Sequence, residues 1–225
     1  MFLSAQIVAG RKFWIIILLP LLWLAFRAMF ILLGVGDGKL EPVNAQSLIG
    51  IPVTLAAMGL GIRIIAGEVD GRTLEIAYTV PGGCHRIWLA KIAAGICLLL
   101  ACEITAAIAV LIFFIPSIPF VALYGVLQAS IFYMVTGMAF SAFFRSEITG
   151  AMAVIILFAI NMILVLNNAQ IRISPFYNPL ALNEMDSAQR FAQTLQNRIL
   201  FIILFVAITL LTFLRVERRE KMLGD

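Results

Sequence analysis

The stretch 104-ITAAIAVLIFFIPSIPFVALYGVLQASIFYMVTGMAFSAFF-144 contains no charged side chain, and it decides the fold of this chain. As one continuous α-helix its 41 residues would extend roughly 60 Å, about twice the hydrocarbon thickness of a bilayer. Pro116 and Pro119 interrupt the stretch, because proline cannot continue a helix. The stretch therefore predicts two membrane-spanning helices joined by a very short turn.

The composition of the whole chain agrees with this interpretation. Of its 225 residues, 63% are apolar and only 12% are charged, and the mean hydropathy is +1.06. Soluble domains are about 45–50% apolar and about 25% charged, so an ordinary soluble protein is excluded. We expect one all-α integral membrane domain over residues 1–225. Its predicted spans are about 13–36, 47–66, 87–115, 120–144, 148–166 and 199–214.

The distribution of basic residues predicts the orientation. If the N-terminus is cytoplasmic, eleven Lys and Arg residues lie in inside segments and four lie outside. Six crossings then place both termini in the cytoplasm of a multi-pass protein of the cell (inner) membrane. Residues 167–198 become an outer segment, and its second half has the spacing of an amphipathic helix that leads into the last span. The net charge of +4 needs no nucleic-acid partner.

The connection between the second and third spans is the most informative polar segment. It reads 67-GEVDGRTLEIAYTVPGGCHRIWLAK-91. Asp70 can cap a helix, residues 73–80 allow about two turns, and the Pro-Gly-Gly sequence from Pro81 ends it. Residues 67–86 therefore predict a short helix on the cytoplasmic surface.

This segment resembles the corresponding connection in the permease subunits of ABC-type exporters, in the ABC type-2 family. The matching positions are Glu68, Gly71, Thr73, Leu74, Glu75, Pro81 and Lys91. Arg72 departs from the compact form of the motif, although the order of the matching residues is kept. The resemblance implies a coupling helix that docks on a separate ATPase subunit, with Asp70 and Arg72 in the same contact. The alternative is a solvated face with a local set of salt bridges.

No Gly-x-x-x-x-Gly-Lys-Ser/Thr sequence is present, so the chain lacks the phosphate-binding loop of an ATPase. The resemblance then implies that ATP and Mg are bound by partner ABC ATPase subunits, and that this chain is not an enzyme and carries no cofactor. It also implies a second copy of the chain, or a similar permease, within the membrane lipid. Two alternatives stay open, namely a haem-export or cytochrome-assembly permease and a non-transporting scaffold. The transported substrate stays open as well.

Two charged residues, Arg27 and Glu103, lie well inside predicted spans, where each costs roughly 3 kcal/mol or more. Glu103 either lines a translocation pathway or pairs with Arg27. Thr105, Gln128 and Asn161 are expected to form hydrogen bonds between helices. The three cysteines have no metal-ligand spacing and are interpreted as small apolar residues, and no metal or catalytic site is expected.

Overall fold

The computed structural model describes residues 13–34, 41–70, 84–166, 172–181 and 186–216. These residues form no strand. Their long helices are α2 (Phe13–Leu32), α3 (Ala45–Asp70), α5 (Cys84–Phe113), α6 (Phe120–Phe144), α7 (Glu147–Leu166) and α8 (Ser187–Val216), and two short 3-10 helices are η1 (Pro42–Asn44) and η2 (Pro179–Ala181). Six helices of the described part are long and apolar enough to cross a membrane, which confirms the predicted all-α, six-helix class. The predicted helix over residues 73–80 lies outside the described residues.

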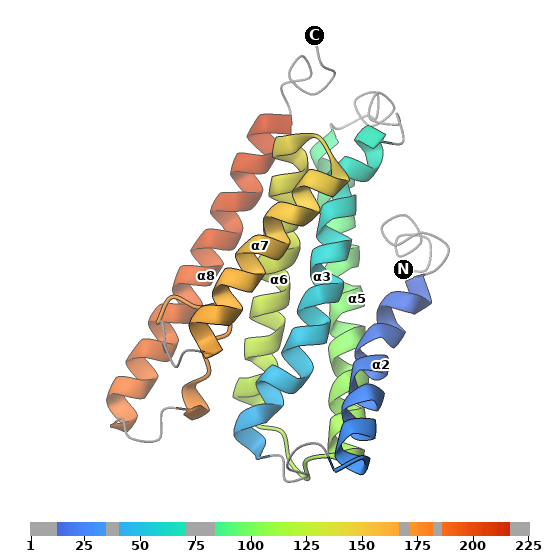
Figure 1. Ribbon diagram of the computed structural model, residues 1–225. Coiled ribbons are helices and arrows are strands. Elements are labelled where there is room, and N and C mark those ends of the chain that lie inside the picture. Colours follow the sequence, from blue (N-terminus) through green and yellow to red (C-terminus); the bar gives the residue numbers. More distant parts are fainter. Residues whose placement is uncertain (1–12, 35–40, 71–83, 167–171, 182–185, 217–225) are drawn as a thin grey trace.

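The six long helices run side by side in alternating directions (Figure 1). The end of α3, the start of α5, the turn between α6 and α7, and the end of α8 lie at one end of the bundle. We call this the terminal end, because the last described residues lie there, and we call the opposite end the far end. Helix α2 starts part-way along the bundle and runs to the far end, so its direction agrees with the six predicted spans.

Helices α3 and α6 form the centre of the bundle. They are the two most buried spans, whereas α2 and α7 are the least buried and lie at the periphery. Such helices suit a bilayer, because an α-helix satisfies its own backbone hydrogen bonds and apolar outer side chains can face lipid. The fully buried side chains at the centre include Val53, Ile64, Val126, Met134 and Met138.

Gly61 allows α3 and α6 to approach closely. A Cβ atom at this position would lie 1.9 Å from the backbone oxygen of Met134, so no other residue fits without moving a helix. At Gly59, two residues earlier on α3, a Cβ atom would meet nothing within 4 Å. Of these two glycines, only Gly61 lies at a close contact between helices.

Pro20 lies inside α2, where it removes the N–H that would bond to the carbonyl oxygen of Ile16. The thiol of Cys102 on α5 donates to that oxygen at 3.5 Å. A neighbouring helix thus satisfies the carbonyl that proline leaves open, as proline within a membrane helix requires. Cys102 is buried, as expected of a small apolar residue, but it also acts as a weak hydrogen-bond donor.

The helix boundaries lie within four residues of the predicted ones except at the last helix. Helix α6 has the predicted bounds and begins directly after Pro119. It ends at Phe144, and the left-handed backbone of the next residue, Arg145 (φ 54°), lets the N–H of Ser146 bond to the carbonyl oxygen of Ser141. Helix α8 begins at Ser187, whereas the last span was predicted from residue 199. The amphipathic stretch and the span form one helix, because the polar residues Gln193, Asn197 and Arg198 are buried against the bundle.

Candidate functional site

Glu68 of α3 binds two residues of α5 at the terminal end. Its Oε1 accepts a hydrogen bond from Nζ of Lys91 at 2.5 Å, and its Oε2 accepts one from Nε1 of Trp88 at 2.9 Å. Nζ of Lys91 also donates to the backbone oxygen of Ile64 at 3.1 Å. We call Glu68, Trp88 and Lys91 the α3–α5 clamp.

The helical repeat brings these groups to one place. Trp88 and Lys91 are three residues apart and therefore share a face of α5, and Ile64 and Glu68 are four apart and share a face of α3. Helix α3 ends at Asp70 and α5 begins at Cys84. The clamp therefore joins the two helix ends between which residues 71–83 run.

The clamp is shielded from solvent. Trp88 is fully buried, and its ring centroid lies 5.8 Å from that of Phe213 on α8. The side chains of Lys91 and Glu68 are 8% and 12% exposed. At this burial each charge depends on the other, because an unpaired buried charge is far more costly than an unpaired surface charge.

A second ion pair lies near the same end. Nε of Arg63 on α3 lies 3.9 Å from Oε1 of Glu147 on α7, and these side chains are 55% and 33% exposed. Water screens such a pair, so it contributes little to stability. It is nevertheless a useful comparison with the clamp, because both pairs link α3 to a neighbouring helix.

The structure brings together two of the predicted coupling residues, Glu68 and Lys91. Asp70 is the last residue of α3. The remaining coupling residues lie outside the described part of the chain, namely Gly71, Arg72, Thr73, Leu74, Glu75 and Pro81. Trp88 was missed by the sequence argument, although its three-residue spacing from Lys91 could have placed it on the same face of the helix.

Glu103 and Arg27, the two charged residues predicted inside spans, lie in different surroundings. Glu103 is buried on α5, and its Oε2 has no hydrogen-bond partner. Arg27 is half-buried on α2. Within the described residues no ion pair joins the two, so Arg27 does not neutralise Glu103.

A second polar cluster joins α6 and α8 in the half of the bundle nearer the far end. Nε2 of Gln128 donates to Oδ1 of Asn197 at 2.9 Å, and Nη1 of Arg198 donates to Oε1 of Gln128 at 2.7 Å. The guanidinium carbon of Arg198 lies 4.7 Å from the ring centroid of Tyr124. We call Tyr124, Gln128, Asn197 and Arg198 the α6–α8 cluster.

The α6–α8 cluster also fixes the chain that precedes η2. Nδ2 of Asn197 donates to the backbone oxygens of Arg172 and Ser174, at 2.7 and 3.0 Å. The hydroxyl of Ser174 in turn donates to Oδ1 of Asn161 on α7 at 3.1 Å. Asn197 therefore provides a hydrogen-bond donor for two backbone carbonyls that lie outside any helix or sheet.

The predicted inter-helix hydrogen bonds are confirmed for Gln128 alone. Asn161 bonds to the loop before η2 and not to a helix, and the hydroxyl of Thr105 donates to Ala101 and Cys102 of its own helix. A short hydroxyl side chain reaches the preceding turn of its own backbone more easily than a neighbouring helix. Asn197 and Arg198 were missed because residues 167–198 were assigned to an outer segment.

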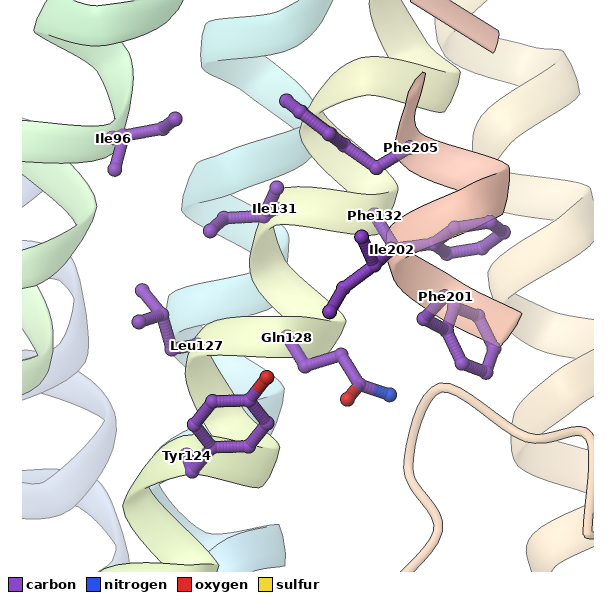
Figure 2. Close-up of a pocket in the computed structure, with 9 residues that line it drawn as sticks. All are labelled: Ile96, Tyr124, Leu127, Gln128, Ile131, Phe132, Phe201, Ile202 and Phe205. Atoms are coloured by element: carbon purple, nitrogen blue, oxygen red, sulfur yellow. The ribbon is translucent and has the colours of Figure 1, made fainter. Parts of the chain in front are cut away.

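A pocket of about 200 Å³ lies beside the α6–α8 cluster, between α5, α6 and α8 (Figure 2). Its lining is aliphatic and aromatic except for the hydroxyl of Tyr124 and the amide of Gln128. In Figure 2 these two residues lie at one end of the pocket, and Ile96 and Phe205 lie at the other. Helix α6 starts at the far end of the bundle, and Tyr124 and Gln128 lie in its first half. The polar end of the pocket therefore faces the far end of the bundle.

No family model matches this chain, and neither a curated protein nor a solved structure matches it. Within the described residues, no group of three or more His, Cys, Asp and Glu side chains could hold a metal ion. The α3–α5 clamp and the α6–α8 cluster with its pocket are therefore the two sites from which a function can be argued.

Proposed function

We propose that this chain is the permease subunit of an ATP-driven ABC exporter, and that it works by alternating access together with a separate ATPase subunit. The observation that carries the proposal is the ion pair between Glu68 and Lys91. Both residues belong to the ordered motif, and they lie on either side of the proposed coupling segment. Six helices that suit a membrane support the same conclusion.

The clamp suits a mechanical role. A force applied to residues 71–83 by a partner would reach α3 and α5 together, because the ion pair of Glu68 and Lys91 links these helices near the ends that flank the segment. Helix α3 is central and contacts α6 through Gly61, so α6 would move with it. Packed helices transmit such displacements because they are close-packed and shift as units.

The partners follow from the same proposal. ATP and Mg are bound by the cytoplasmic ATPase subunit, which docks on Asp70, Arg72, Leu74 and Glu75, while Glu68 stays in the clamp with Lys91. A second copy of this chain, or a similar permease, completes the route across the cell membrane. In this arrangement residues 71–83 and both termini are cytoplasmic.

Coexpression with a candidate ABC ATPase subunit from the same organism, followed by detergent pull-down and ATPase measurement, tests the proposal. We expect Leu74→Asp and Glu75→Arg each to reduce association and ATPase stimulation at least tenfold, because a buried charge or a reversed charge opposes docking. Matched controls are Ile173→Asp and Glu41→Arg, which make the same changes at exposed positions of the far end. The controls should behave like the wild type.

Two results would overturn the proposal. Unchanged association and stimulation in both coupling variants would show that residues 71–83 are not the docking segment. Association without any stimulation of the ATPase by the wild-type chain would indicate a scaffold and not a permease.

A further inference from the structure

Arg198 is a buried cation without a counter-ion among the described residues. It is 8% exposed, and no ion pair joins it to a carboxylate of the described part of the chain. Nη1 bonds to the neutral amide of Gln128, and Nη2 is buried with no hydrogen-bond partner. The full positive charge of the guanidinium therefore stays unneutralised by described groups.

Such a charge is costly inside a membrane helix. An amide oxygen and an aromatic face stabilise a guanidinium, but they do not cancel its charge. Buried cations in proteins are normally paired with an anion, and an unsatisfied donor of this kind indicates a missing acceptor. Arginine favours carboxylate and phosphate oxygens, because its planar donors match them in pairs.

The pocket beside Arg198 indicates what kind of anion would bind. Tyr124 and Gln128, which hold the guanidinium, also line the pocket, and the rest of the lining is apolar. Its volume of about 200 Å³ exceeds that of an engineered apolar cavity of about 150 Å³ that binds benzene. A small soluble anion would not use this apolar volume, whereas an anion attached to a hydrocarbon chain would.

The direction of the pocket also matches a membrane lipid. From Tyr124 to Phe132 the lining changes from polar to apolar over two turns of α6, or roughly 12 Å. Tyr124 is 38% and Ile202 is 56% exposed, so the pocket borders the outer surface of the bundle, where acyl chains lie. A headgroup at the polar end would direct its chain toward the apolar end (Figure 2).

We propose that the pocket and Arg198 form a binding site for an anionic membrane lipid, with the headgroup at the guanidinium and part of one acyl chain between Ile96, Ile131 and Phe205. The Tyr124 ring lies over the guanidinium and is 38% exposed, so a rapid rotamer change of this side chain opens the guanidinium to the headgroup. The site is independent of any ATPase partner, so it stands or falls separately from the proposed function.

Native mass spectrometry of the full chain in detergent tests this site. The protein is equilibrated with phosphatidylglycerol and phosphatidylcholine of identical acyl chains, which differ in headgroup charge. We expect the wild type to retain one phosphatidylglycerol with at least tenfold preference, and Arg198→Gln to abolish the preference. The matched control is Arg172→Gln, which removes a charge from an exposed residue of the loop that Asn197 holds.

A second pair of variants tests the pocket without altering charge. Ile131→Trp fills the apolar volume and should reduce phosphatidylglycerol retention at least tenfold, whereas Ile160→Trp, on the exposed face of α7, should not. This pair decides the question even if Arg198→Gln fails to fold.

Three outcomes would overturn the proposal. Equal retention of the two lipids by the wild type would remove the charge preference. Retention that is unchanged in both Arg198→Gln and Ile131→Trp would place the lipid elsewhere. Displacement of the lipid by inorganic phosphate at millimolar concentration would show a site for a free anion.

Discussion

Removing either charge of the α3–α5 clamp should destabilise the protein, and the losses from the two removals should not add. The changes are Glu68→Gln and Lys91→Met, singly and together. The two side chains are 12% and 8% exposed and 2.5 Å apart, so they belong to the class of buried pairs. Loss of one partner from such a pair costs about 3–5 kcal/mol, because the other charge is left without compensation.

The other hydrogen bonds of the clamp reduce this cost for both single variants. Lys91 keeps the carbonyl oxygen of Ile64 when Glu68 is changed, and Glu68 keeps Nε1 of Trp88 when Lys91 is changed. We therefore expect each single variant to lose about 2–4 kcal/mol of unfolding free energy. The double variant leaves no charge to be compensated, so its loss should be smaller than the sum of the single losses by about 2 kcal/mol.

Reversible unfolding in mixed micelles, with dodecyl sulfate as denaturant and tryptophan fluorescence as signal, gives the four free energies of this cycle. The control is the same cycle on Arg63 and Glu147, whose side chains are 55% and 33% exposed and 3.9 Å apart. Exposed pairs contribute about 0–1 kcal/mol, so the control coupling should be below about 1 kcal/mol. A clamp coupling no larger than the control coupling would refute our interpretation of the clamp as a buried ion pair.

Three further changes have expected outcomes. Gly61→Ala should lower the free energy of unfolding by about 2 kcal/mol or more, because its Cβ atom would lie 1.9 Å from the backbone oxygen of Met134, whereas Gly59→Ala, with nothing within 4 Å, should be neutral or slightly stabilising in the same unfolding assay. Glu103→Gln should leave yield and melting temperature in detergent unchanged or raised, because the buried carboxylate has no ion-pair partner to orphan, and a lowered yield would contradict this. A single cysteine at position 72 on a cysteine-free background should react with membrane-impermeant maleimide only after the membrane is opened, and labelling of intact cells would reverse the proposed orientation.

The fold class was predictable because its signals are local. The charge-free stretch 104–144 is too long for one span, and Pro116 and Pro119 fix the position of the break. Helix α6 has the predicted bounds because a proline pair precedes it and Arg145 follows it. Neither signal depends on what the helix packs against.

The start of α8 was not predictable in the same way. An amphipathic stretch has the same period whether its polar face lies on a membrane surface or against other helices. Asn197 and Arg198 fall on that polar face, and their hydrogen bonds to Gln128 on α6 and to the loop before η2 turn the face inward. Tertiary contacts therefore decided both the boundary of this helix and the members of the α6–α8 cluster.

The candidate coupling site was predictable in its residues but not in its geometry. Order along the chain singled out Glu68 and Lys91, which are 23 residues apart. Their pairing depends on how α3 and α5 align, and Trp88 joins them because it shares a face with Lys91. A motif names residue types at positions, whereas the contact between them is a property of the packed helices.

The two buried cations of these sites are compensated differently, and this difference separates their roles. Lys91 has a carboxylate at 2.5 Å, so its charge is neutralised within the chain and an external anion has little to gain there. Arg198 has an amide oxygen and an aromatic face, so most of the favourable interaction with an anion is still open. The clamp is therefore suited to hold two helices together while they move, and Arg198 is suited to attract a ligand. Disruption of the clamp should appear in the stability of the fold, whereas disruption at Arg198 should appear in the affinity for a bound anion.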